Sequence, residues 1–242
     1  MKMMKKFFLS ALCIAFSTMF LHAQTAEDLL KTFTKKHKKD TSSLSTADVI
    51  SGLKEALNNG VNTGTSKLSA ANGFFANAAV KILMPPDAQK VEKTLRGVGL
   101  GKQVDDAILS MNHAAEDATK SAAPIFLNAI KQMSIEDAWA ILRGSDTAAA
   151  AYLRKTTTAP LTNAFRPVIE SSLEKVDATK YWNTVFSNYN KFSLHKINPD
   201  LGAYVTDKAL SGIFYEIAQQ EIQIRKDPVA RTTDILKKVF GQ

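Results

Sequence analysis

The sequence predicts an all-α protein: a single multi-helix domain with short loops and one short irregular or extended segment near residues 72–86. Three observations lead to this prediction. Helix-spaced apolar residues and helix-capping residues follow one another from residue 44 to the end of the chain. No strand-like alternation competes with them, and no internal repeat of fixed period indicates a solenoid. This pattern is typical of helices packed around one core.

Residues 1–23 have the three regions of a secretory signal peptide. Three lysines lie among the first six residues, residues 7–21 form an uncharged, largely apolar run, and Ala23 is small. The apolar run is too short for a comfortable membrane span. We therefore expect cleavage after Ala23 and export to the bacterial periplasm or the extracellular space.

Residues 24–43 are polar and predict a flexible, lysine-rich tether ahead of a helical domain at 44–242. A basic segment of this kind can contact an anionic membrane surface, but a solvated tail is the favoured interpretation. Nucleic acid is not an expected partner, because aromatic residues are not interleaved with the basic ones. The basic side chains are Lys31, Lys35, Lys36, Lys38 and Lys39.

The first elements of the domain are a helix and the irregular segment. Ser45 is a capping residue for a helix that begins just after it, and we expect Gly60 and Gly64 to weaken its far end. Pro85 and Pro86 then end any regular pattern in the irregular segment.

Further helices are expected in close succession. Asn198-Pro199 predicts the start of a helix that extends to about Lys226, and Asp227-Pro228 predicts the start of the last helix, which ends near Phe240. A glycine-rich turn at 97–101 is expected to separate two helices rather than to bind phosphate, since no strand precedes it. Between these points the expected helical segments are 87–96, 102–120, 124–133, 135–143, 146–157, 160–176 and 178–192.

Several kinds of catalytic and cofactor sites have no support in the sequence. The only cysteine, Cys13, lies in the predicted signal peptide, so the mature chain is expected to have no disulfide or thiolate. The remaining histidines are far apart and form no metal-binding motif, and no GxSxG sequence indicates a nucleophile. We expect no cofactor and no metal.

One set of polar residues stands out within apolar helix faces. Glu221 interrupts an apolar stripe and lies four residues before Arg225, while Asn112 lies on the apolar face of the 102–120 segment. The favoured interpretation is a structural ionic network, and the alternative is a ligand-facing acid-base cluster. Asn112 is expected to satisfy either a loop backbone or a neighbouring side chain, with a pocket-lining amide as the alternative. The candidate site residues are Asn112, Asp207, Glu221, Arg225, Asp227 and Arg231.

Several short segments of the chain carry a family resemblance. The most specific are Tyr204 to Leu210, Gly212 to Phe214, Ile217-Ala218, Glu221, Ile224 to Pro228, Arg231 and Asp234 to Gly241, and those upstream are Gly52 to Leu57, Val91 to Lys93, Met111 to Glu116 and Ala159 to Leu161. They are similar to a bacterial family known as domain of unknown function 4197. The similarity covers roughly residues 44–242, and His113 stands where the family has arginine. It implies an exported, mainly helical protein and brings no known activity or cofactor.

Three functional classes follow from these observations. The favoured one is a cofactor-free binding or protein-interaction module of the bacterial envelope, because the sequence holds no catalytic motif. The second is a hydrolase or lyase that uses the acid and arginine residues of the C-terminal helices. The third is a membrane-surface component that uses the lysine-rich tether.

Overall fold

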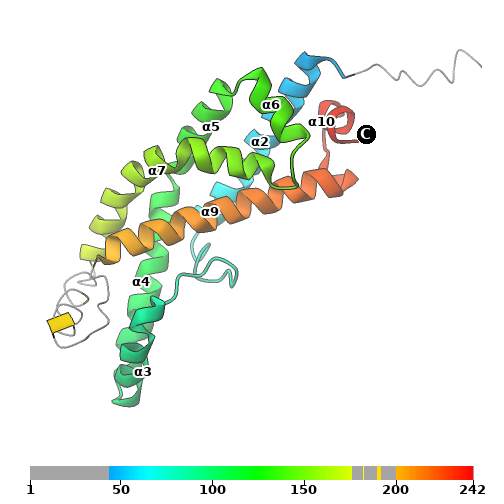
Figure 1. Cartoon of the computed structure of the whole chain (residues 1–242). Coiled ribbons are helices and arrows are strands. Elements are labelled where there is room, and N and C mark those ends of the chain that lie inside the picture. The colour runs from blue at the N-terminus through cyan, green and yellow to red at the C-terminus, as the bar shows by residue number, and fades with distance from the viewer. Residues whose placement is uncertain (1–43, 176–181, 183–189, 192–199, 242) are drawn as a thin grey trace, which may run out of the picture. The chain divides into compact units, whose positions relative to one another are not determined.

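A computed structural model describes residues 44–175, 182, 190–191 and 200–241 (Figure 1). Helices account for the regular structure of these residues, which include no strand, and the all-α prediction is confirmed. Residues 44–242 form one compact unit. The helices are α2 (Thr46–Ser69), η1 (Pro86–Ala88), α3 (Gln89–Gly97), α4 (Gly101–Thr119), α5 (Ala122–Gln132), α6 (Ile135–Leu142), α7 (Ala148–Glu174), α9 (Leu201–Lys226), η2 (Pro228–Ala230) and α10 (Asp234–Phe240).

Several predictions fall on other parts of the chain. The signal peptide, the tether with its lysines, most of the expected 178–192 helix and the Asn198-Pro199 cap lie outside the described residues. Among the helices that are described, none is both long enough and apolar enough to cross a membrane.

The core lies between the two longest helices and the elements that flank them. Helices α7 and α9 run side by side; α4 packs against both of them, and α2 packs against α9 (Figure 1). Leu161, Phe165 and Ile169 recur every four residues on α7 and are fully buried, which is the spacing of one helix face. Burial of this apolar stripe against α9 and α4 supplies the main stabilising term.

Helix α2 continues past the two glycines that were expected to weaken its far end. Gly60 and Gly64 do not weaken its far end, and the helix continues to Ser69. Both glycines are buried where α9 passes: a Cβ atom at Gly60 would lie 3.3 Å from Cβ of Gln220, and one at Gly64 would lie 3.6 Å from Cβ of Glu216. The glycines therefore allow close helix packing, and tertiary contacts compensate for their low helix propensity.

Helix α7 joins two segments that the sequence predicted to be separate. It extends over 27 residues and contains both Pro160 and Pro167. The two prolines are exposed, whereas Leu161, Phe165 and Ile169, between and after them, are fully buried. Packing of one continuous apolar face outweighs the backbone hydrogen bonds that the prolines remove.

Helix boundaries near the C-terminus also differ from the prediction. Asp227 and Pro228 begin the short 3-10 helix η2 rather than the last helix, and α10 starts at Asp234 with Thr233 as its cap. Helix α9 starts after Asp200, whose side chain accepts a hydrogen bond from the backbone N–H of Ala203 at 2.8 Å.

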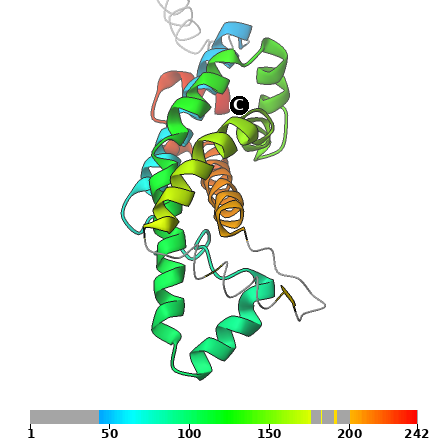
Figure 2. The same ribbon diagram turned by 90° about the vertical axis from the view of Figure 1, so that its left-hand side faces the viewer.

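Other local predictions are confirmed. Ser45 forms a capping box with Asp48 at the start of α2. The glycine-rich turn separates α3 from α4, with Gly99 at φ 86°, a conformation that favours glycine. Residues 70–85 contain turns and irregular backbone but no helix, as the sequence predicted. Figure 2 shows α3 and the first half of α4 reaching beyond the other helices.

Candidate functional site

A groove of about 770 Å³ lies between α3, α4 and the start of α9. Trp182, which is 6% exposed, contributes an aromatic wall, and Met84 and Ala88 contribute the end of the irregular segment. The other apolar residues that line it include Val91, Leu95, Leu100, Val104, Ala107 and Met111.

Helix α4 presents two different flanks to this groove. Leu100, just before α4, and Val104, Ala107 and Met111 on it are three or four residues apart and form an apolar flank. A parallel row at 103, 106, 110 and 113 carries an amide, a carboxylate, a hydroxyl and an imidazole. An elongated molecule in the groove would therefore meet apolar atoms on one side and hydrogen-bonding groups on the other.

Helix α3 forms the opposite wall. Val91 and Leu95 are four residues apart and both line the groove, yet no residue of this helix is buried. The helix packs chiefly on α4 and η1. An amphipathic helix normally covers its apolar face, so α3 leaves apolar surface available on the groove side.

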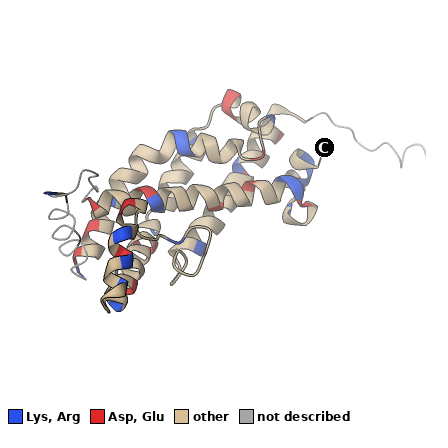
Figure 3. Cartoon of the chain, turned by 60° about the horizontal axis from the view of Figure 1, so that its bottom comes forward, with Lys and Arg blue, Asp and Glu red and all other residues tan. Residues whose placement is uncertain are grey.

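Several charged residues of α3 and the start of α4 form ion pairs. Arg96 donates to Glu92 at 3.0 Å and to Asp105 at 2.8 Å, and hydrogen bonding to Asp105, then Glu92, raises the pKa of the Arg96 guanidinium. Lys102 lies 2.7 Å from Asp106, whose hydrogen bond raises the pKa of the lysine. Figure 3, in which the ribbon is coloured by residue type, shows basic and acidic positions interspersed along these helices.

Glu92 and Asp106 contribute carboxylates to the lining, whereas no Lys or Arg lines the groove within the part of the chain that is described. The charged groups among these lining residues are therefore acidic. Arg96 and Lys102, the cations that pair with them, are not among the lining residues.

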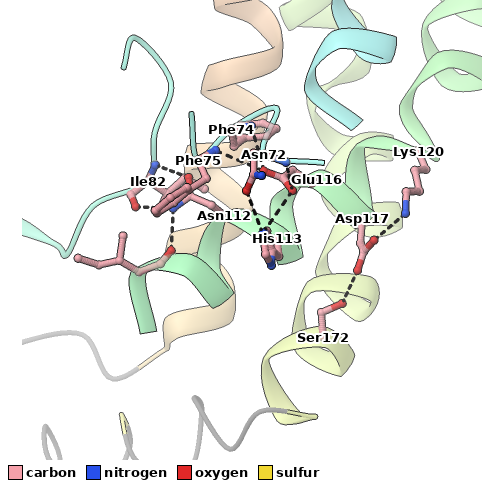
Figure 4. Close-up of polar contacts among 11 residues, drawn as sticks. Asn72, Phe74, Phe75, Ile82, Asn112, His113, Glu116, Asp117, Lys120 and Ser172 are labelled. Atoms are coloured by element: carbon pink, nitrogen blue, oxygen red, sulfur yellow. Dashed lines mark hydrogen bonds and ion pairs between the residues drawn. The ribbon is translucent and has the colours of Figure 1, made fainter. Parts of the chain in front are cut away.

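Asn112 lies one residue beyond the groove-lining Met111 and binds the irregular segment (Figure 4). Its Oδ1 accepts from the backbone N–H of Ile82 at 2.8 Å, and its Nδ2 donates to the carbonyl oxygens of Ile82 at 2.8 Å and Ile108 at 2.7 Å. The side chain is fully buried. Asn112 thus satisfies both backbone groups of Ile82, much as a neighbouring strand would.

Glu116, one turn further along α4, binds the start of the same segment (Figure 4). Its carboxylate accepts from the backbone N–H groups of Asn72 at 3.1 Å, Phe74 at 3.1 Å and Phe75 at 3.3 Å. Asn72 has φ 60°, a left-handed conformation that asparagine tolerates. The buried carboxylate compensates backbone groups that no helix or strand satisfies.

A second buried carboxylate binds this segment from α9. Glu216 is 2% exposed and accepts from Nζ of Lys67 and from Nδ2 of Asn77, each at 2.9 Å. The irregular segment is therefore held by polar side chains from two helices.

Glu221 and Arg225 join three helices. The two carboxylate oxygens of Glu221 accept from the N–H groups of Ala149 and Ala150, each at 3.0 Å, in the first turn of α7. Arg225 donates to Glu221 at 2.9 Å and to the carbonyl oxygens of Ile141 at 2.7 Å and Leu142 at 3.3 Å, at the end of α6. Each charge thus lies at the helix end whose free backbone groups and dipole favour it.

Arg231 completes this network. It donates to the carbonyl oxygens of Ile224 at 3.0 Å and Arg225 at 2.7 Å, at the end of α9. A cavity of about 20 Å³ beside Glu221 and Arg225 is lined mostly by apolar atoms. That volume is on the scale of one water molecule, about 10–15 Å³, so the space does not admit a substrate.

The structure therefore separates the candidate site residues into groups. Glu221, Arg225 and Arg231 lie together, whereas Asn112 binds the irregular segment. The carboxylate of Asp227 accepts from the N–H of Val229 at the start of η2, and Asp207 is exposed on α9.

Two buried carboxylates that matter here were not among the candidates. Glu116 follows Asn112 by four residues, so the helical spacing that singled out Asn112 could have found it. Glu216 adjoins Ile217 within the apolar part of α9 and could have been noticed in the same way. The groove itself had no sequence signal, because its apolar residues resemble ordinary core positions.

The described residues contain no group of three histidine, cysteine or acidic side chains that could hold a metal ion. A family model described as protein of unknown function (DUF4197) matches residues 43–241. No curated protein and no solved structure matches the chain.

Proposed function

This chain belongs to the DUF4197 family, and we propose that it is a binding protein whose groove between α3 and α4 takes one small amphipathic molecule. The size and lining of the groove carry this proposal. Small-molecule sites have volumes of about 300–1,000 Å³ and are mostly apolar with a few polar groups. The groove, at about 770 Å³, has these properties.

The apolar part of the ligand lies along Leu100 and Ala107, opposite Val91 and Leu95 on α3 and above the buried Val104 and Met111. These side chains offer a surface as long as two turns of α4, which suits an alkyl chain. Removing such a chain from water gains about 0.8 kcal/mol for each buried methylene.

The polar end of the ligand lies along Gln103, Ser110 and His113 and carries no negative charge. Among the described residues that line the groove, the charged groups are the carboxylates of Glu92 and Asp106, and they disfavour a carboxylate or phosphate nearby. An uncharged or cationic head group meets no such repulsion.

The hydrolase or lyase alternative has less support from the geometry. The carboxylate of Glu221 and the guanidinium of Arg225 are engaged by backbone groups of α6 and α7 and by each other. A catalytic acid or base needs a path to a substrate, and the adjoining cavity has the volume of about one water molecule.

The proposal also includes export, which rests on residues 1–23. The basic start, the apolar run and Ala23 have the pattern of a cleaved signal peptide. Export would place the groove in the bacterial envelope, with the lysines of residues 24–43 free to contact an anionic membrane surface. N-terminal sequencing of the exported protein should give Gln24 as its first residue, and a cytoplasmic protein that retains Met1 would contradict this.

Ligand titration tests the groove. The chain has two tryptophans, so Trp139→Phe leaves Trp182, which lines the groove, as the fluorescent reporter. The probes are decyl glucoside, decyltrimethylammonium and decanoate, each below its micelle-forming concentration. We expect the uncharged and cationic probes to bind at least about tenfold more tightly than decanoate.

A matched pair of variants shows where the probes bind. Ala107→Phe places a large side chain in the groove and should abolish binding. Ala151→Phe adds the same side chain at an exposed position on α7 and should leave binding unchanged. Equal binding to both variants, tighter binding of decanoate, or no binding of any probe would overturn the proposal.

A further inference from the structure

We propose that Asn112 is a positioning residue for this groove: through the backbone of Ile82 it sets the place of Met84, which lines the groove. The inference rests on the proposed function, because it concerns the same groove. It gives a role to a buried polar side chain that does not itself contact the ligand.

The side chain of Asn112 binds a residue that lies 30 positions earlier in the chain. Its amide binds both the N–H and the C=O of Ile82 at 2.8 Å, and Ile82 is two residues before Met84. The same Nδ2 also donates to the carbonyl of Ile108 on α4, at 2.7 Å. Asn112 therefore ties the irregular segment to the helix that forms the main wall of the groove.

A second hydrogen bond, from α9, holds the next residue. The hydroxyl of Tyr204 on α9 donates to the carbonyl oxygen of Leu83 at 2.8 Å. The backbone is thus held from α4 at Ile82 and from α9 at Leu83, immediately before Met84. Pro85 then restricts the chain on the other side of Met84.

Met84 lies in a segment whose position depends on these hydrogen bonds. Met84 is 9% exposed, lines the groove and belongs to a segment without helix or strand to hold it in place. A small displacement of a wall residue alters the shape of a binding site. Loss of the Asn112 amide should therefore change ligand affinity even where the helices remain folded.

The experiment measures the environment of Met84 and the affinity for the ligand separately. Asn112→Leu keeps the approximate size of the side chain and removes both hydrogen bonds to Ile82. In protein labelled with ¹³C at the methionine methyl groups, the Met84 signal of the unliganded variant should shift or broaden. Binding of decyl glucoside should weaken by at least about tenfold.

Thr119→Val is the matched control. Thr119 is also a buried polar residue of α4, but its hydroxyl donates only within the helix, to the carbonyl of Ala115 at 2.7 Å. We expect this variant to leave the Met84 signal and the probe affinity unchanged. If Asn112→Leu does not fold, Tyr204→Phe provides a second test, because it removes a hydroxyl from a partly exposed side chain. This variant should also shift the Met84 signal and weaken probe binding.

A folded Asn112→Leu or Tyr204→Phe protein with the wild-type Met84 signal would overturn the positioning role. So would a shifted Met84 signal with unchanged probe affinity. Failure of the probes to bind wild-type protein would overturn the proposed function instead, and the Met84 signal would still report whether Asn112 sets this wall.

Discussion

At the scale of single residues, two buried carboxylates in this protein accept hydrogen bonds from backbone groups. Glu116 accepts three N–H groups of the irregular segment, and Glu221 accepts two N–H groups at the start of α7. A buried carboxylate is costly unless it is hydrogen-bonded, and unpaired backbone groups carry a similar cost. Each of these hydrogen bonds therefore satisfies a buried carboxylate and a backbone N–H group together.

The Glu221–Arg225 pair gives the first prediction. Both side chains are nearly buried, with exposed fractions of 8% and 12%. Arg225→Ala leaves the carboxylate of Glu221 without its cation and frees two carbonyl oxygens of α6. The free energy of unfolding should fall by about 3 kcal/mol, as measured by chemical denaturation.

Glu221→Gln should be costly as well. Both oxygens of the carboxylate accept N–H groups, so the amide nitrogen of glutamine would face a donor. Replacement of the exposed Asp207 by asparagine removes a carboxylate of the same helix and serves as the control. Wild-type stability in Arg225→Ala would contradict the structural role and return Glu221 and Arg225 to the search for a functional site.

At the scale of elements, helix continuity is decided by packing. The sequence predicted most helices of the domain, because capping residues and apolar spacing are local signals. It placed a break before Pro160 that the structure does not have, and a weak end at Gly60 that is instead a close contact with α9. Where a long apolar helix face is buried, its packing outweighed the low helix propensity of proline and glycine.

Pro160 therefore gives the second prediction. It is exposed within α7, where proline lacks a backbone N–H and fits the helix poorly. Pro160→Ala should raise the free energy of unfolding by about 1–2 kcal/mol, less than the full helix-propensity difference because the unfolded chain also gains freedom.

Pro86→Ala is the matched control for this change. Pro86 lies at the start of η1, a position that suits proline, so its replacement should leave stability unchanged or slightly lower. Thermal melts of the two variants provide the comparison. A lower melting temperature for Pro160→Ala would show that Pro160 contributes a contact that outweighs its helix penalty.

At the scale of the whole domain, its first and last described helices are joined by an ion pair. Nζ of Lys238 on α10 lies 2.7 Å from the carboxylate of Asp48 on α2. This hydrogen bond, followed by those from Ser45, lowers the pKa of Asp48 from 3.8 to about 2.

The third prediction concerns pH. Because the folded-state pKa of Asp48 lies below the unfolded value, its stabilising contribution is present above about pH 3.8 and is lost as the pH falls through about 2. The melting temperature of wild type should exceed that of Asp48→Asn near neutral pH, and the difference should shrink as the pH approaches 2. A difference that persists unchanged at the lowest pH would contradict this assignment.

The fourth prediction concerns the extent of the domain. Residues 44–242 form one compact unit, and the family match begins at residue 43. Limited proteolysis of the chain from Gln24 onward should therefore trim it to a stable core that starts near residue 44. The trimmed and untrimmed proteins should melt at the same temperature. Unfolding of the protein on trimming would show that residues 24–43 contribute to the fold.

The sequence by itself determined the fold class, most helix positions, the irregular segment near residues 72–86 and the family. These depend on spacing, caps and turn residues that act over a few positions. It also drew attention to Asn112, Glu221 and Arg225, because a polar residue in an apolar stripe needs a partner.

Only the tertiary structure decided which partners those residues have and where a ligand could bind. The partners are mostly backbone groups, such as those of Ile82 and Ala149, which carry no signal in the side-chain sequence. They lie 30 and 72 positions from Asn112 and Glu221, so only the packing of α4 and α9 against distant segments brings them together. The groove arises for the same reason: its apolar residues resemble ordinary core positions in the sequence, and only the packing of α3 and α4 with Met84 and the start of α9 brings them around one space.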